Sequence, residues 1–185
     1  MRKTPVTFFL LSITLVVFSC IRMTPEEKEV YKLIGKKVNL KMFGKVYVKD
    51  TLINLDIILN KHKYISLVYL QDGCAPCYPI YADWHMKLDS LGVMDHYSVL
   101  FIIEGTPYSN IKGFLENARQ VGEFEEKFYT VIDPDYGFFS GNPDIPEHLV
   151  KRSITIDNKG RIKLIGVPFA SPEMAKLFLK VTKQQ

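Results

Sequence analysis

The most constraining feature of this sequence is a pair of cysteines between a buried strand pattern and a helical pattern. Residues 64–70 form a nearly continuous apolar run, which is typical of a strand buried on both faces. Cys74 and Cys77 follow this run, and apolar residues then recur at three- and four-residue spacing from Ile80 to Leu91. A motif at this junction lies at the carboxyl end of a strand, where open α/β sheets place their functional groups.

The elements predicted downstream continue the alternation of strands and helices. They are a strand at 97–103, a helix beginning near Ser109, a strand at 128–132, a hairpin of strands at 153–157 and 161–165, and a last helix opening at Ser171. Alternation implies parallel strands, and the hairpin adds an antiparallel edge. We therefore predict an α/β fold with a central mixed sheet flanked by helices.

The region before this sheet is predicted to be short and partly polar. Residues 26–34 favour a short helix, and residues 37–48 alternate in part, which indicates a two-strand β extension. The 185 residues allow one domain with attachments, because domains contain roughly 100–200 residues. We expect residues 20–35 to form a tether with a short helix, and residues 36–185 to form the domain with its N-terminal β extension.

The first twenty residues are typical of an export signal. The positive start MRK precedes an apolar run at residues 6–18, which is shorter than the about 20 residues that a spanning helix needs. The ending VFSC at residues 17–20 resembles the lipobox of bacterial lipoproteins. This resemblance implies that residues 1–19 are a removed signal peptide and that Cys20 is lipidated, which anchors the protein to a membrane.

This interpretation places the protein in the cell envelope, outside the cytoplasm and facing the periplasm or the surface. Disulfides can form and persist in that compartment. With Cys20 used by the lipid, the three cysteines leave one pair of thiols. The 24 basic and 20 acidic residues form no basic stripe interleaved with aromatic residues, so we expect no nucleic acid partner.

The placement of the cysteine pair favours redox chemistry. Two cysteines three residues apart in a first helical turn lie on one side of the helix, at a separation that a disulfide can span. The helix start favours a thiolate, which is the form that attacks a disulfide. We assign Cys74, predicted to be the more exposed, as the nucleophile and Cys77 as the resolving thiol of a redox disulfide. Pro76 fits this turn because it has no N–H to lose there.

Two other roles for the pair are less favoured by its spacing. A structural disulfide that closes a four-residue loop contributes only about 2 kcal/mol, which is a weak reason to keep one. A zinc site needs two further ligands, and the sequence has no second cysteine pair and no closely spaced histidine pair. We therefore expect no metal and no cofactor.

Residues 64–181 resemble the thioredoxin-like thiol–disulfide oxidoreductases of bacterial envelopes, of the TlpA and ResA type. The resemblance rests on the Cys74–Cys77 motif, on the late strand–Asp-x-x-Gly–strand hairpin at 153–162, and on Gly166-Val167-Pro168 before the final helix. It implies a thioredoxin-like fold and an enzyme that exchanges thiols and disulfides. It also implies protein thiols or disulfides as substrates and a redox partner protein.

Several family features are replaced in this sequence. The place of the family's cis-proline is taken by residues 150–152, and Val68 stands where thioredoxin has a buried acid that accepts the proton. Asp72 and Glu104 end predicted neighbouring strands and are candidate substitutes for that acid. The direction of exchange does not follow from the motif, because the missing acid and proline also set the potential.

Two further functions stay open at this point. Sco-type copper chaperones share the predicted fold and bind copper through two cysteines and a distant histidine. His148 occupies a comparable place here, so Cys74, Cys77 and His148 form an alternative Cu(I) site. The other alternative is a redox-silent binding module that keeps the fold as a scaffold.

Overall fold

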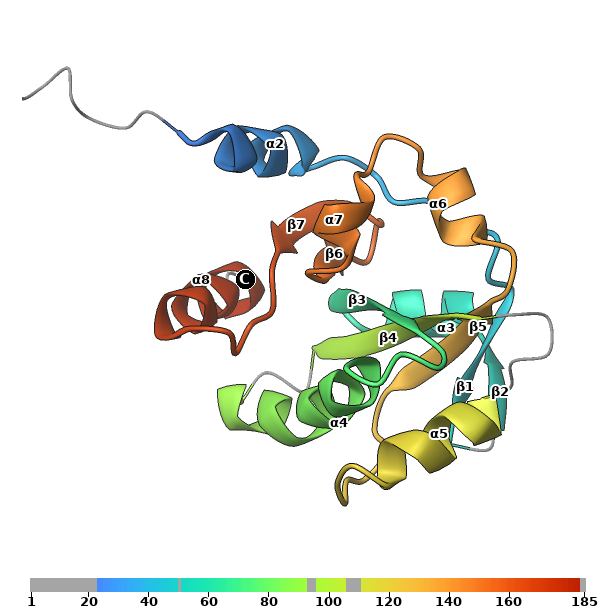
Figure 1. Cartoon of the computed structure of the whole chain (residues 1–185). Helices are drawn as coiled ribbons and strands as arrows, with labels where there is room; N and C mark the ends of the chain where they lie inside the picture. Colours follow the sequence, from blue (N-terminus) through green and yellow to red (C-terminus); the bar gives the residue numbers. More distant parts are fainter. Residues whose placement is uncertain (1–22, 50, 93–95, 106–110, 184–185) are drawn as a thin grey trace, which may run out of the picture. The chain divides into compact units, whose positions relative to one another are not determined.

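The computed structural model describes residues 23–49, 51–92, 96–105 and 111–183 (Figure 1). The chain divides into two compact units, residues 1–32 and residues 33–185. The predicted signal peptide and Cys20 lie outside the described residues. No helix in the described ranges has the length and apolarity needed to cross a membrane.

The described part of the first unit is most of helix α2 (Pro25–Leu33). Its start is a capping box: Glu27 N–H donates to Thr24 Oγ1 at 3.1 Å, and Thr24 N–H donates to Glu27 Oε2 at 2.6 Å. Pro25 takes the first helical position, where its missing N–H costs nothing. The short helix predicted near residues 26–34 is therefore present.

The second unit holds one seven-stranded sheet in the order β2-β1-β5-β4-β3-β6-β7. The strands are β1 (Lys45–Val48), β2 (Thr51–Asn54), β3 (Tyr64–Gln71), β4 (Tyr97–Glu104), β5 (Tyr129–Asp133), β6 (Ile154–Asp157) and β7 (Ile162–Ile165). The helices are α3 (Leu55–Lys61), α4 (Cys77–Lys87), the 3-10 helix η1 (Leu88–Leu91), α5 (Ile111–Arg119), α6 (Gly137–Gly141), α7 (Glu147–Val150) and α8 (Pro172–Lys183).

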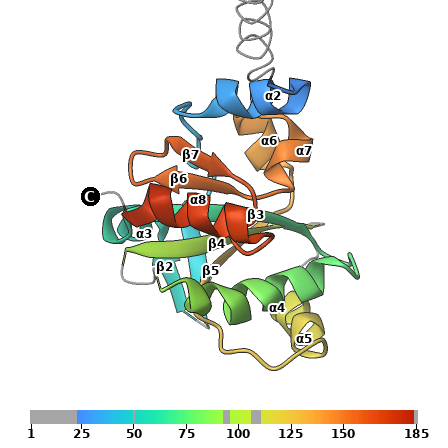
Figure 2. The same cartoon turned by 90° about the vertical axis from the view of Figure 1, so that its left-hand side faces the viewer.

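The sheet is mixed, as predicted. β3, β4 and β5 run parallel, β6 is antiparallel to β3, and β7 is antiparallel to β6. The crossover helices α4 and α5 lie side by side on one face in both views (Figures 1 and 2). The chain moves from β3 to β4 to β5 in one direction across the sheet. Because both crossovers are right-handed, their helices lie on the same face.

The core on the face of α4 and α5 follows from the alternation of residues along the central strands. Val68, Leu70, Phe101 and Ile103 point to this face and pack in one cluster with buried aromatic residues of the two helices. Tyr69, one residue out of phase, contacts α6 instead, with its ring 4.7 Å from Phe139. Both faces are covered, which explains why β3 and β4 are almost continuously apolar.

The predicted N-terminal β extension exists but lies further along the chain. Residues 37–43 contribute only one isolated bridge, from Lys37 to Arg161, and the two strands of the hairpin are β1 and β2. Val38 N–H donates to the carbonyl of Gly160, so this segment runs beside the β6–β7 turn. Its alternation therefore reports burial against that turn rather than a strand of the hairpin.

Three short helices were absent from the sequence-based prediction. α3 begins because the Asn54 side chain accepts from Asp56 N–H at 2.8 Å, and it buries only Leu55 and Ile58. α6 and α7 have five and four residues. Helices this short carry too few periodic positions to be recognised in a sequence.

Candidate active site at the Cys74–Cys77 disulfide

Cys74 and Cys77 form a disulfide in the connection between β3 and α4, with their Cα atoms 5.3 Å apart. Cys74 is half-buried, and Cys77 is only 8% exposed. An incoming sulfur therefore reaches Cys74 more readily than Cys77. This asymmetry is what a nucleophile and a resolving thiol require.

The helix begins at Cys77, so Cys74 lies before the first helical turn and not, as predicted, within it. Pro76 is its N-cap with helical φ and ψ, and Cys77 N–H donates to the carbonyl of Cys74 at 2.8 Å. Cys74 therefore lies one turn before the first helical residue, close to the open N–H groups of the helix start. That position stabilises a thiolate through the helix dipole and these N–H groups.

The turn before Cys74 is held by bonds to the ends of the strands. Asp72 N–H donates to the carbonyl of Glu104 at 2.7 Å, which continues the β3–β4 pairing by one residue. Gly73 has φ +76, a conformation that residues with a side chain rarely adopt. Gln71 N–H points at Cys77 Sγ over 3.4 Å, so the buried sulfur has a backbone donor beside it.

A cavity of about 400 Å³ opens beside the disulfide. Most of its lining is apolar, and charged side chains lie around it. Its lining includes Glu104 from the end of β4, Lys151 from the segment before β6, Phe169 from the loop before α8, and Ile80, Asp83 and Trp84 from α4. Its size is within the range of ligand-binding clefts, about 300–1,000 Å³.

The two carboxylates predicted as proton acceptors, Glu104 and Asp72, have different surroundings in the structure. Glu104 lines the cavity together with both cysteines, whereas Asp72 does not line it. One Asp72 oxygen instead accepts from Gly73 N–H at 3.0 Å. Tyr136 donates a hydrogen bond to Glu104, and this bond and the charge of Glu104 raise the pKa of Tyr136.

A third carboxylate at this edge was missed in the sequence. Asp133 ends β5 in register with Glu104 and is 3% exposed. It accepts from Gly137 N–H at 2.7 Å, from Phe138 N–H at 3.0 Å and from the Tyr69 hydroxyl at 3.3 Å. These bonds cap α6, so Asp133 has a structural role. In the sequence, the Asp133-Pro134 dipeptide at the end of β5 looks like an ordinary turn signal. The capping role of Asp133 is therefore not visible there.

The segment that replaces the family's cis-proline also lines the cavity. No described residue is joined by a cis peptide bond, and Ser153, just before β6, has φ +72. Ser153 donates its hydroxyl to the carbonyl of Gly166 at 2.9 Å. Lys151 and Arg152 precede it and face the same cavity.

The alternative copper site is not assembled in the described part of the chain. His148 is exposed on α7, and no group of three or more His, Cys, Asp and Glu side chains there could hold a metal ion. Cys74, Cys77 and His148 therefore do not form a ligand set.

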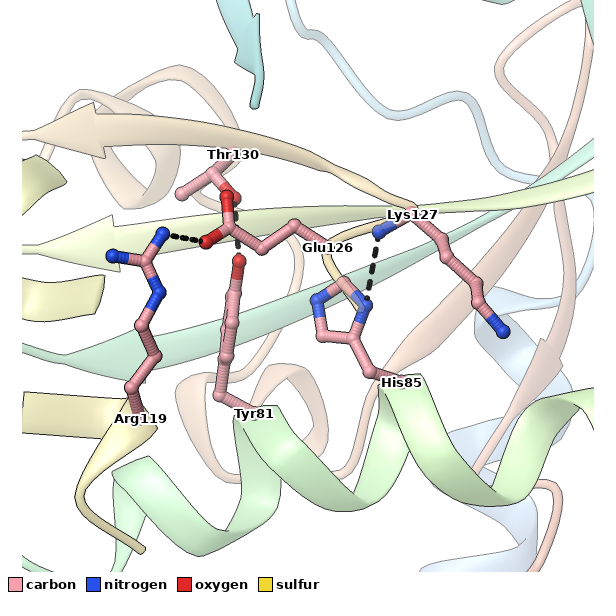
Figure 3. Close-up of polar contacts among 6 residues, drawn as sticks. All are labelled: Tyr81, His85, Arg119, Glu126, Lys127 and Thr130. Atoms are coloured by element: carbon pink, nitrogen blue, oxygen red, sulfur yellow. Dashed lines mark hydrogen bonds and ion pairs between the residues drawn. The ribbon is translucent and has the colours of Figure 1, made fainter. Parts of the chain in front are cut away.

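Tyr81 and His85 connect the body of α4, the helix that carries Cys77, to residues 127–130 through polar contacts (Figure 3). The Tyr81 hydroxyl lies 3.4 Å from Thr130 Oγ1 on β5, and burial raises the pKa of Tyr81. His85 accepts from Lys127 N–H at 3.3 Å, and its ring stacks on Phe128 with centroids 4.8 Å apart. His85 is therefore a core histidine and belongs to the packing of α4.

Several solved structures share this fold. The chain is similar to the thioredoxin domain of a thiol-disulfide oxidoreductase from Bacteroides vulgatus, with 13% identity, a TM-score of 0.56, and coverage of 81% of this chain and 98% of that one. It is similar to a protein from Chlorobium tepidum described as a thiol:disulfide interchange protein DsbE, with 15% identity, a TM-score of 0.54, and coverage of 80% and 97%.

A conserved protein of unknown function from Bacteroides fragilis has the same fold, with 16% identity, a TM-score of 0.52, and coverage of 79% of this chain and 98% of that one. No protein-family model matches the sequence, and no curated protein matches it. The fold of this chain is thioredoxin-like, as predicted. At these identities the likeness shows the fold alone, so a functional conclusion has to come from the geometry of the site.

Proposed function

We propose that this protein exchanges thiols and disulfides with other proteins in the bacterial cell envelope, with Cys74 as nucleophile and Cys77 as resolving thiol. The observation that carries this proposal is the disulfide itself, placed between a central strand and a helix start, with one accessible and one buried sulfur. The thioredoxin-like fold and the adjoining cavity support it.

The reducing direction has two steps. The Cys74 thiolate attacks a substrate disulfide, so a bond between Cys74 and the substrate forms while the second substrate sulfur leaves as a thiolate. The Cys77 thiolate then attacks the Cys74 sulfur, the mixed disulfide breaks and the Cys74–Cys77 bond forms. Two electrons pass to the substrate, and a separate redox partner protein restores the dithiol. The reverse order of steps oxidises a substrate.

We assign Glu104 as the proton acceptor for the buried Cys77 thiol. Two carboxylates, Glu104 and Asp83, line the same cavity as the disulfide, and Asp83 is paired with Lys87 at 2.7 Å. Asp72 does not line the cavity and accepts from Gly73 N–H. A thiol must lose its proton before it can attack, and a carboxylate in the same cavity can take it. The variant Glu104→Gln should therefore move the pH profile of exchange upward, and Asp72→Asn should leave it in place.

The anchoring part of the proposal concerns residues 1–20. We propose that residues 1–19 are removed and that lipid on Cys20 holds the domain at an envelope membrane, with residues 20–35 as the tether. Labelling of cells with a radioactive fatty acid should mark the wild-type protein and spare Cys20→Ala. Equal labelling of the two would contradict the anchor without touching the exchange activity.

The exchange proposal is tested by trapping. The variant Cys77→Ser should accumulate mixed disulfides on Cys74 in cells, and Cys74→Ser should accumulate none. In a reductant-coupled insulin assay, wild type should exceed the Cys74→Ser background. If wild type reduces insulin no faster than Cys74→Ser, and Cys77→Ser traps no mixed disulfide, the chain is a redox-silent scaffold and the proposal fails.

A further inference from the structure

Tyr78, the residue after Cys77, reaches back over the turn that presents Cys74. Its hydroxyl oxygen accepts from Gly73 N–H at 3.0 Å and from Asn117 Nδ2 at 3.2 Å. Its ring lies 5.2 Å from the ring of Phe114 on α5. One side chain therefore joins the turn before Cys74, the first turn of α4 and the middle of α5.

The bond to the Tyr78 hydroxyl restrains the backbone of Gly73, a residue with no side chain and a positive φ. Gly73 adopts φ +76, and no other heavy atom lies within 4 Å of where its Cβ would be. Packing against a side chain therefore cannot hold this residue. Its N–H is fixed by two acceptors, Asp72 Oδ1 and the Tyr78 hydroxyl, each at 3.0 Å. Since Cys74 is the next residue, the orientation of this peptide determines where the Cys74 sulfur lies.

Asn117 is connected to the turn through Tyr78. It belongs to α5, whereas the turn joins β3 to α4, and its amide donates to the same oxygen that accepts from Gly73. Two donors fill the acceptor positions of a tyrosine hydroxyl, so its orientation is defined from both sides. A phenylalanine would keep the ring contact with Phe114 and lose both bonds.

We propose that Tyr78 is a positioning residue for Cys74, with Asn117 orienting its hydroxyl. The clamp, defined here as Gly73, Tyr78 and Asn117, holds Cys74 at the start of α4, where the helix N–H groups favour the thiolate. The inference rests on the proposed function, because it assigns Cys74 as the attacking sulfur. It extends that function to a residue outside the cysteine motif.

The test is the pH dependence of Cys74 alkylation in the reduced full-length protein, measured with Cys77→Ser as the common background. Tyr78→Phe removes the hydroxyl that binds Gly73 N–H, which should slow alkylation near neutral pH by about threefold to tenfold and move the profile to higher pH. Asn117→Ala should give a smaller change in the same direction. Tyr47→Phe, at a partly exposed tyrosine of β1, is the matched control and should overlay the parent.

A double-mutant cycle separates positioning from general packing. If Asn117 acts through the Tyr78 hydroxyl, then Asn117→Ala should have no further effect in the Tyr78→Phe background. An unchanged profile in Tyr78→Phe, or full additivity of the two changes, would overturn the inference. Alkylation needs no substrate protein, so a shifted profile alongside failed trapping would reject the exchange function and leave the clamp standing.

Discussion

Two cavities in the described part of the domain differ in size and in chemistry, and the larger of these two is not the candidate active site. A cavity of about 750 Å³ lies between residues 37–44, the start of α3 and the β6–β7 turn. The cavity beside the disulfide has about 400 Å³ and shares no lining residue with it. The larger cavity is lined by lysine, asparagine and apolar side chains and by Asp56, and its lining has no cysteine or histidine.

The comparison teaches that local backbone geometry is a better guide to the candidate active site than the volume of a cavity. The smaller cavity combines a sulfur pair, the carboxylates of Asp83 and Glu104, and the helix start of α4. The larger one is walled by segments whose backbone bonds serve the fold, such as Val38 N–H to the carbonyl of Gly160 at 2.8 Å. The predictions below test this division between chemistry and packing.

The largest expected effect is that substitutions at the two cavities change different properties: one changes exchange activity, and the other changes stability. Cys74→Ser should reduce exchange to background and lower the free energy of unfolding by about 2 kcal/mol, the contribution of a short disulfide loop. Phe43→Ala, at a buried residue of the larger cavity, should cost about 3–5 kcal/mol and leave exchange by the folded fraction intact. Denaturant unfolding and the insulin assay on the same samples measure both quantities.

A matched control sharpens this result. Under reducing conditions wild type and Cys74→Ser should unfold at the same denaturant concentration, because the disulfide that distinguishes them is absent. A persistent difference would mean that Cys74 stabilises the domain in another way.

The next effect compares two glycines with positive φ, one in the turn before Cys74 and one that lines the larger cavity. Alanine at Gly73 (φ +76) or Gly160 (φ +77) should cost about 1–2 kcal/mol from backbone strain alone. Gly160→Ala should cost more, since its new Cβ would lie 3.2 Å from the carbonyl oxygen of Val38. Only Gly73→Ala should slow exchange. The control is Gly122→Ala, where the Cβ meets nothing within 4 Å and φ is not positive.

A smaller effect is a pH dependence of stability from His62, the residue that caps the end of α3. Burial, with a contribution from the charge of Lys61, lowers the pKa of His62 in the folded state below its ordinary 6.5. The unfolded chain therefore binds the proton first, and stability is lost as pH falls from 6.5 through the folded pKa. The free energy of unfolding should fall over this window in wild type.

The substitution His62→Gln should remove that part of the slope and keep a partner for the Tyr129 hydroxyl, which lies 3.0 Å from His62 Nε2. Urea unfolding at several pH values measures the slope. A wild-type slope that survives unchanged in His62→Gln would assign the effect to another group.

The smallest effects belong to the lysines around each cavity. Lys151 forms an exposed ion pair with Glu147 at 2.7 Å, and exposed pairs contribute about 0–1 kcal/mol. Lys151→Ala and Lys159→Ala should therefore both change stability by less than about 0.5 kcal/mol. Lys151→Ala should alter the salt dependence of exchange, since Lys151 lines the cavity by the disulfide, and Lys159→Ala should not. Exchange rates at two salt concentrations distinguish them.

Much of the fold could be predicted because its signals are local. A continuous apolar run at residues 64–70, the cysteine pair and a helical period after it are properties of neighbouring residues. Periodicity reflects burial of one helix face or of both sheet faces, so long elements such as β3, β4 and α4 are visible in it. The same argument explains why α6 and α7, with five and four residues, were not visible.

The sequence by itself determined the order of the main elements and the position of Cys74 and Cys77 at a strand–helix junction, because propensity and periodicity act within a few residues. Only the tertiary structure decided which carboxylate lies by the disulfide, that His148 is not assembled with the cysteines, and that Tyr78 and Asn117 meet at Gly73. These are contacts between segments far apart in the chain. They depend on the register of β3 against β4 and on the packing of α4 against α5, which no local pattern encodes.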